Sequence, residues 1–348
     1  MMPGPTRLFA IATLLPAVLL LAGTLLGGPA LWLGLFCMTL LAGTLDHLVA
    51  RDASAGCEFP AGDGLSVVLG GFHFALLFSA VYALGRGSVL SPLEHAGVFL
   101  GVGVWLGQVS NSNAHELIHR SNRWLFRLGK WIYISLLFGH HTSAHPKVHH
   151  RFVGSHDDPN TAQLGESYYA FVARAWPEGF AAGRDMETAL LARRNLRFAA
   201  LHHPYVTYIL GAVGFAGLAL VLGGLFGLLW FVLLAGFAQL QLLMSDYVQH
   251  YGLVRRRIDP TRLEPVGPHH SWNAPHWYSG AMMLNAPRHS DHHAHPTKPY
   301  ATLELGDVPM LPRSLPVMAL IALYPRAWSR IMDKRAAKWR RPPAGTAA

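Results

Sequence analysis

Histidines recur in this sequence at spacings that could bring several imidazole groups to the same metal ion. They occur in four motifs: HELIH at 115–119, AHPKVHH at 144–150, DYVQHYGL at 246–253 and RHSDHH at 288–293. In HELIH the two histidines lie at positions i and i+4, which share one face of a helix. The four motifs together supply nine histidines: His115, His119, His145, His149, His150, His250, His289, His292 and His293.

The number of these histidines exceeds what one metal ion needs. A zinc ion takes four ligands, of which three come from the protein when the site is catalytic. Nine imidazoles therefore suggest two metal ions, each with four or five ligands. Iron, copper, nickel and zinc all accept imidazole, so the ligand type alone does not choose the metal.

Other functions fit parts of this pattern. HExxH alone is also a zinc-protease signature, with Glu116 as the general base, but that interpretation leaves seven of the nine spaced histidines without a role. A cluster that senses pH through histidine protonation would not require the i, i+4 spacing. A metal transporter predicts ionisable residues inside the apolar segments, and only His73 clearly meets that condition.

Polar residues near the motifs are candidates for orienting the ligands through hydrogen bonds to their second ring nitrogen. We assign this role to Glu116, Asp157, Asp158, Asp246, Gln249, His270 and Asp291. Five further histidines adjoin the motifs and are candidates for the same role: His140, His141, His156, His269 and His295. Structural or interfacial roles are expected for His47, His95, His202, His203 and His276.

The elements that must position the motifs are membrane helices. The chain has 348 residues, 51% hydrophobic and 14% charged, whereas soluble domains carry about 25% charged residues. Six apolar runs, each close to the roughly 20 residues that cross a bilayer as a helix, lie near 8–27, 29–45, 65–84, 92–110, 205–222 and 224–245. Short glycine-containing connections join them into three hairpins. The two cysteines form no CxxC pair, which excludes an all-cysteine metal site.

The distribution of basic residues predicts the orientation of these helices. The three short connections contain a single basic residue, Arg86, and the long segments contain nearly all the others. The positive-inside rule therefore places both termini and all four motifs in the cytoplasm. We predict an all-α integral membrane protein with a single domain over 1–348, in which six transmembrane helices in three hairpins carry a cytoplasmic, histidine-rich helical cap. The cap comprises 111–204 and 246–337, and 338–348 forms a disordered tail.

Beyond the nine histidines, the chain resembles the integral-membrane di-iron hydroxylases and desaturases of the fatty acid desaturase-like superfamily. More narrowly, it is similar to the bacterial alkane 1-monooxygenases and to the xylene monooxygenase hydroxylase subunit. The similar segments are LDHLVARD, HELIHR, AHPKVHHRFVGSHDDPNTA, DYVQHYGLVR, HHSWN and RHSDHHAHPTKPY. The resemblance implies that the nine histidines ligate two irons, and that an enzyme of the bacterial cytoplasmic membrane uses O2. It also implies electrons from a rubredoxin or ferredoxin and its NAD(P)H-dependent reductase.

The resemblance divides between two branches of that group. Ala144, Val148 and Gln249 stand where alkane hydroxylases usually carry Glu, Gly and Glu, and they look more like the xylene branch. The segments RHSDHHAHP and HYGL look like the alkane branch. The resemblance thus implies hydroxylation of the terminal methyl group of alkanes or alkyl chains. Methyl-arene hydroxylation, and fatty acyl hydroxylation or desaturation, remain alternatives at the same di-iron site.

Such a substrate would reach the metals from the bilayer, in which it dissolves. No side chain breaks an alkane C–H bond by acid–base or nucleophilic chemistry, so a metal cofactor must carry the reaction while the protein positions the substrate. A channel among the membrane helices would guide apolar chains to the metals. Candidate lining residues, each of which could instead face lipid or pack between helices, are Trp32, Phe36, Leu40, His73, Phe74 and Leu77.

Overall fold

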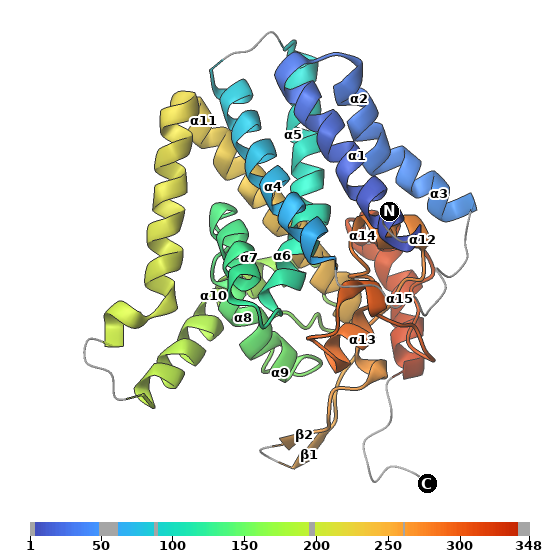
Figure 1. Ribbon diagram of the computed structural model, residues 1–348. Helices are drawn as coiled ribbons and strands as arrows, with labels where there is room; N and C mark the ends of the chain where they lie inside the picture. The colour runs from blue at the N-terminus through green and yellow to red at the C-terminus, as the bar shows by residue number, and fades with distance from the viewer. Residues whose placement is uncertain (1–3, 49–61, 87–89, 195–198, 260–261, 340–348) are drawn as a thin grey trace.

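The chain is a helical membrane protein, and Figure 1 shows a bundle of long helices above a cap of shorter elements. The structure is a computed structural model, which describes residues 4–48, 62–86, 90–194, 199–259 and 262–339. The bundle is formed by α1 (Gly4–Leu26), α2 (Pro29–Phe36), α3 (Ala42–Leu48), α4 (Asp63–Gly85), α5 (Pro92–Trp105), α6 (Asn111–Ile118) and α11 (Pro204–His250). A π-helical turn at Cys37–Leu41 joins α2 to α3, and another at Leu106–Ser110 joins α5 to α6.

Among the described residues, four helical stretches are long and apolar enough to cross a membrane. They are Arg7–Leu26, Pro29–Leu48, Asp63–Gly85 and Pro204–His250. The predicted runs near 8–27, 29–45 and 65–84 coincide with the first three, to within a few residues. The run near 92–110 is helical as well, but it is not among the four, and Glu94, His95 and Gln108 lower its mean hydropathy.

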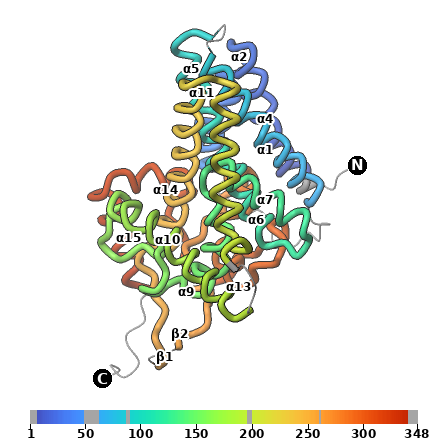
Figure 2. The backbone as a smooth tube through the Cα atoms, turned by 90° about the vertical axis from the view of Figure 1, so that its left-hand side faces the viewer, coloured from blue at the N-terminus to red at the C-terminus, as the bar shows by residue number. Residues whose placement is uncertain are grey.

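Helix α11 contains both of the last two predicted runs. Its 47 residues would extend for about 70 Å if straight, more than twice the roughly 30 Å of a bilayer's hydrocarbon core. Gly224 has φ 65° and ψ −160°, a conformation that favours glycine, and it interrupts the helical geometry. Figures 1 and 2 show the result, in which the yellow limb of α11 runs up to the bend and the gold limb runs back in the opposite direction.

The cap lies at the end of the bundle away from the Gly224 bend (Figure 1) and is built from loops and mostly short helices, with one helix of 25 residues among them. Its first part contains α7 (Arg123–Ser135), α8 (His141–Ala144), a π-helical turn at His145–His149, α9 (His150–Phe152), α10 (Tyr168–Ala192) and a 3-10 turn at Ala199–His202. Its second part contains the antiparallel strands β1 (Arg257–Asp259) and β2 (Arg262–Leu263), α12 (Trp277–Met282), α13 (His289–Ala294), α14 (Leu315–Ala322) and α15 (Pro325–Trp339), with 3-10 turns at Pro268–His270 and Tyr300–Thr302.

Helix α15 corrects the predicted start of the disordered tail. It continues through Lys338 and Trp339, because its apolar face packs into the cap around the buried Trp328. The indole of Trp328 lies 5.2 Å from the rings of both Tyr247 and Tyr251, measured between centroids. The remainder of the predicted tail, 340–348, lies outside the described residues.

Close backbone packing holds α4 against the bend of α11. A Cβ atom added at Gly85 would lie 2.6 Å from the carbonyl oxygen of Gly223 and 2.7 Å from the Cα of Gly227. Contacts this short leave no room for any side chain. The three glycines therefore let the two helices approach to backbone contact, as small residues commonly do in membrane helix packing.

We expect Gly85→Ala to destabilise the protein, because the added methyl group overlaps backbone atoms that cannot move aside. Overpacking of this kind costs about 1–3 kcal/mol, which would appear as a lower midpoint of thermal unfolding in detergent. Gly71→Ala is the matched control on α4, since a Cβ there meets no atom within 4 Å. Equal midpoints for the two variants would contradict this account of the α4–α11 contact.

Candidate metal centre

The nine histidines of the four motifs converge in the cap as two adjacent clusters. Five of them form the first cluster, in which one nitrogen from each ring lies within 4.8 Å of all the others: His115, His119, His145, His150 and His292. The remaining four form the second cluster by the same criterion and are all buried: His149, His250, His289 and His293. Each cluster draws on at least three separate segments of the chain, so neither can form before the cap has folded.

The π-helical turn at His145–His149 decides which histidine joins which cluster. Its hydrogen bonds run from i to i+5, and the backbone N–H of His150 donates to the carbonyl oxygen of His145. His145 and His150 therefore share a face and meet in the first cluster, whereas His149 points into the second. The i, i+4 spacing of His145 and His149 thus does not bring them to one ion, because this segment is not a regular α-helix.

The nitrogen–nitrogen distances suit shared metal ions. In the first cluster the Nε2 atoms of His115 and His145 are 2.7 Å apart, and those of His145 and His150 are 3.0 Å apart. In the second cluster the Nε2 atom of His289 lies 2.9 Å from that of His250 and 3.0 Å from that of His293. Two nitrogens bound at right angles about 2.1 Å from one ion would be about 3.0 Å apart.

Six ring nitrogens of the cluster histidines are buried without a hydrogen-bond partner among the described residues: Nδ1 of His145, His150, His289 and His293, and Nε2 of His119 and His149. The two Nε2 atoms belong one to each cluster. A buried polar atom without a partner is costly unless something else satisfies it. A metal ion in each cluster would satisfy one of these nitrogens, so the residues present fit a two-metal centre.

The protonation states of the rings also suit metal binding. Burial lowers the pKa of His119 to about 4 and holds the pKa values of His145 and His292 well below the ordinary value. These imidazoles are therefore neutral near neutral pH, which is the form that binds metals. For His149, burial alone would lower the pKa, but the charge and hydrogen bond of Asp158, together with the charge of Asp246, outweigh burial and raise the pKa.

Asp158 is placed to orient a cluster histidine. Its Oδ2 atom accepts a hydrogen bond of 2.8 Å from Nδ1 of His149, which leaves Nε2 of that ring directed at the second cluster. The same carboxylate accepts a hydrogen bond from the hydroxyl of Thr161, so its own position is fixed. A carboxylate behind a metal-binding histidine sets the tautomer and the ring orientation.

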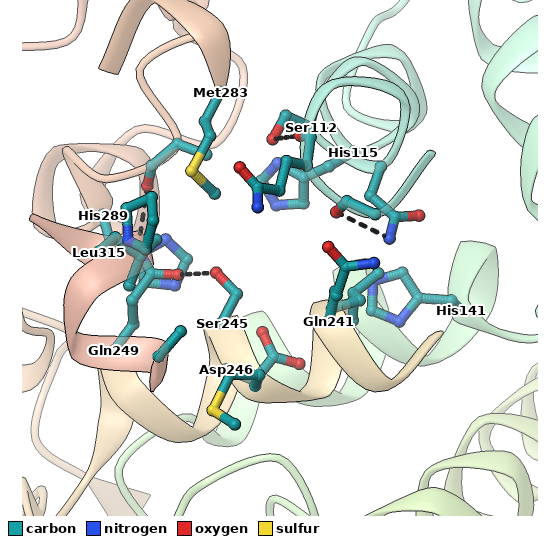
Figure 3. Close-up of a pocket in the computed structure, with 18 of the residues that line it drawn as sticks. Ser112, His115, His141, Gln241, Ser245, Asp246, Gln249, Met283, His289 and Leu315 are labelled. Atoms are coloured by element: carbon teal, nitrogen blue, oxygen red, sulfur yellow. Dashed lines mark hydrogen bonds between the residues drawn. The ribbon is translucent and has the colours of Figure 1, made fainter. Parts of the chain in front are cut away.

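Other candidates for this role lie at the edges of the centre. Asp246 accepts a hydrogen bond from the side chain of Asn160, and Gln249 donates to the carbonyl oxygen of Ala286. Both side chains line the cavity shown in Figure 3. The backbone oxygen of His270, rather than its ring, lies 3.4 Å from Nδ1 of His250.

Three candidates face away from the clusters. Asp157 is about half exposed and pairs with Arg257 at 3.0 Å. Glu116 pairs with Arg120 at 3.0 Å and accepts a hydrogen bond from the backbone N–H of Tyr300. The carboxylate of Asp291 binds side chains outside the clusters, namely His295 and Lys298.

A cavity of about 100 Å³ opens beside both clusters (Figure 3). His115 and His145 of the first cluster and His289 of the second line it. The remaining walls are mainly apolar or amide side chains, including Asn111, Gln241, Met283 and Leu315. None of these four residues was predicted from the sequence, although an amide such as Gln241 inside an apolar run is a signal that could have identified one of them.

A larger cavity of about 1160 Å³ adjoins the first and extends along α3, α11 and α14. The two cavities have five lining residues in common: Gln108, Gln241, Met244, Pro316 and Ala319. These shared residues place the two cavities next to each other.

The predicted channel residues mostly lie away from these two cavities. Of the six, only Leu40 is among the described residues that line either cavity. His73 is buried between the hydroxyls of Ser110 and Ser135, at 2.7 Å from each, and Leu77 is buried in the core. Phe74 stacks on Phe215. Trp32 and Phe36 are partly exposed, at 38% and 42%.

Comparisons with known proteins agree with this geometry. The family model described as fatty acid desaturase matches residues 91–313, a range that contains all nine histidines. Alkane 1-monooxygenase 1 of Alcanivorax borkumensis is 33% identical over 272 residues, which cover 77% of this chain. Alkane 1-monooxygenase of Ectopseudomonas oleovorans is 32% identical over 268 residues, again 77% of this chain.

The coverage of the relatives' own chains differs between these matches. The matched regions span 66% of each of the two alkane 1-monooxygenases, just under two thirds of their length. The xylene/toluene monooxygenase hydroxylase component XylM of Pseudomonas putida is 28% identical over 325 residues. That match covers 90% of this chain and 84% of the relative.

We expect Asp158→Asn to lower the affinity of the centre for iron about 10- to 100-fold, because the substitution removes the charge behind His149. The measurement is the iron retained by the purified protein during titration with a chelator. Asp157→Asn is the matched control, since Asp157 is the adjacent residue but faces Arg257 at the surface. Equal iron retention by the two variants would show that Asp158 does not support the centre.

Proposed function

Because this chain belongs to the fatty acid desaturase family, we propose that it is a membrane di-iron monooxygenase that hydroxylates the terminal methyl group of alkanes or alkyl chains. The observation that carries the proposal is the pair of histidine clusters that share a largely apolar cavity. The reaction consumes the hydrocarbon, O2, two electrons and two protons. It yields an alcohol and one water molecule, so an external electron donor is required.

In this proposal, each part of the site has a defined task. The nine histidines hold two irons, which supply the O2-dependent oxidising chemistry that no side chain has. Asp158 fixes the ring of His149. Met283 and Leu315 line the small cavity and exclude water from the position of the methyl group. The larger cavity holds the rest of the chain.

The proposal includes a placement in the bacterial cytoplasmic membrane. Six helical crossings in three hairpins would leave both termini and the cap in the cytoplasm. Three observations support this arrangement: the four apolar helices, the reversal of α11 at Gly224, and the position of the clusters at one end of the bundle. The substrate would then enter from the bilayer, while the metals lie near the membrane surface.

We also propose a separate electron donor of the rubredoxin or ferredoxin type, reduced by an NAD(P)H-dependent reductase. The chain contains two cysteines and no CxxC pair, so it lacks the ligands for such a redox centre of its own. An electron donor that binds the cytoplasmic face of the cap would reach the site without entering the membrane.

A methyl-arene or a fatty acyl chain is the second candidate substrate. The match to XylM covers more of both chains than the matches to the alkane 1-monooxygenases do. Gln249, one of the residues that resemble the xylene branch, also lines the small cavity. Product analysis separates the two reaction types. Hydroxylation of an aryl-methyl or an alkyl-methyl group gives an alcohol, whereas desaturation of a fatty acyl chain gives an alkene.

A zinc protease is a poorer candidate. Its general base would be Glu116, but Arg120 and the backbone of Tyr300 engage that carboxylate. His115 and His119 do not form an isolated pair either, because three further histidines surround them.

We expect the purified protein to contain about two irons per chain, since four or five imidazoles are available to each ion. Elemental analysis gives the stoichiometry, and Mössbauer spectroscopy on iron-57-labelled protein tests whether the two irons are magnetically coupled. One zinc and no iron would overturn the proposal.

We expect His292→Ala to abolish alkane oxidation, because it removes a ligand from the first cluster. His295→Ala is the control, since the His295 side chain is 65% exposed and pairs with Asp291 outside the clusters. Activity is measured as alcohol formed by membranes supplied with a reconstituted electron donor. Comparable activity in the two variants would be inconsistent with a metal-ligating role for His292.

A further inference from the structure

The short segment from His145 to His150, which supplies histidines to both clusters, is held from behind by one buried carboxylate. We propose that this carboxylate, Glu187 on α10, is a positioning residue. It fixes the rotation of the segment about its own axis and so directs three imidazoles at the two metal positions. This inference rests on the proposed two-metal centre and adds to it a residue that lies outside every histidine motif.

The histidine segment is too short and irregular to keep this orientation by itself. It consists of α8 with four residues, the π-helical turn with five and α9 with three. Helices of this length are not stable in isolation, because nucleation costs more than a single turn of hydrogen bonds returns. π-Helical turns are also rare, and most of them occur inside longer α-helices. Contacts from neighbouring elements must therefore set the orientation of the segment.

Glu187 binds two donors that come from this segment. Its side chain is 6% exposed. Its Oε1 atom accepts a hydrogen bond of 2.6 Å from the hydroxyl of Ser143 and forms an ion pair with the ammonium group of Lys147. Ser143 lies two residues before the π-helical turn, and Lys147 is the third residue of the turn. Hydrogen bonds to a charged group are stronger than those between neutral groups, so this contact can hold the segment in place.

The contact with Glu187 lies on the side of the segment that faces away from the clusters. Ser143 and Lys147 are four residues apart, and His145 and His149 follow them at the same spacing, two residues further along. Each residue turns a helix by about 100°, so side chains two residues apart point in nearly opposite directions. A rotation of the segment would therefore break the contact with Glu187 and turn the imidazoles away from the metal positions at the same time.

The surrounding helices hold Glu187 in turn. Gly183, one helical turn earlier on α10, lies close to Ala144, since a Cβ added at Gly183 would be 3.1 Å from the Cβ of Ala144. The hydroxyl of Ser143 donates to Glu187, so it accepts the hydrogen bond of 2.8 Å from the hydroxyl of Tyr208 on α11. This network connects the histidine segment both to α10 and to the membrane helix α11.

Glu187 and Asp158 control different parts of the centre. Asp158 accepts a hydrogen bond from His149, which belongs to the second cluster alone. Glu187 instead holds a segment that supplies imidazoles to both clusters. Glu187 is also not one of the residues that line the two cavities beside the clusters. Loss of its charge should therefore change both metal sites without changing the cavity walls.

Mössbauer spectroscopy of iron-57-loaded protein tests the inference. Glu187→Gln keeps an acceptor for Ser143 but removes the charge that holds Lys147. We expect the signals of both irons to change and the affinity for iron to fall about tenfold. In Asp158→Asn only the signal of one iron should change. A loss of stability alone would lower the iron content but leave the spectrum of the bound iron as it is in the wild type.

Further variants separate positioning from general stability. Asp185→Asn is the control on α10, because that carboxylate is 65% exposed and pairs with Arg184. Lys147→Met should reproduce the spectral change of Glu187→Gln, and the double variant should show no larger change, because both substitutions break the same ion pair. Lys147→Arg keeps the charge and should retain the wild-type spectrum. An unchanged spectrum in Glu187→Gln, or additive changes in the double variant, would overturn the inference.

Hydrogen–deuterium exchange of the metal-free protein distinguishes this inference from the proposed function. In lipid nanodiscs, Glu187→Gln should speed exchange in the peptide from His145 to His150 about tenfold, as expected for the loss of one charge-assisted hydrogen bond. Faster exchange together with an unchanged spectrum of the bound iron would overturn the inference and keep the proposed function. A wild-type protein that takes up no iron would overturn the proposed function, whereas faster exchange in its Glu187→Gln variant would still support the anchoring of the segment by Glu187.

Discussion

The structure depends on the convergence of nine imidazoles in the interior of the cap. To bind a metal, each ring must be neutral. Each ring is also buried or nearly so, and directs one nitrogen into one of the two clusters. Neutral imidazoles gain little from one another, so the segments that carry them must be held in place from outside. Asp158 fixes the ring of His149, α15 packs Trp328 against Tyr247 and Tyr251 near the end of α11, and close glycine contacts fix α4 against α11.

The four histidine motifs and the membrane helices were predictable from sequence, because the motif spacing is unusual and the apolar runs are long. The division of the histidines between the two clusters was not, because it depends on a π-helical turn at His145–His149 that no propensity indicates. For a similar reason Asp157 and Asp158 could not be distinguished by sequence, although one faces Arg257 at the surface and the other faces His149. Their different environments follow from the path of the loop after α9.

The same limit applies to the route of the substrate. An ionisable residue within an apolar run, such as His73, attracts attention in a sequence, but here two serine hydroxyls satisfy it. The cavities are lined instead by residues from segments far apart in the chain, such as Leu40, Gln241 and Ala319. A cavity is a property of how helices pack, so no local pattern reveals it.

Two short segments that each carry histidines of both clusters have a mechanical consequence. The segment from His145 to His150 contributes to both clusters, and so does the segment from His289 to His293. Each segment therefore links the two clusters over a few residues. The spacing between the clusters is then set by the local geometry of these segments, and not by the long helices. Bending or tilting of the bundle as the bilayer changes thickness would move the whole centre as one body and leave its internal dimensions unchanged.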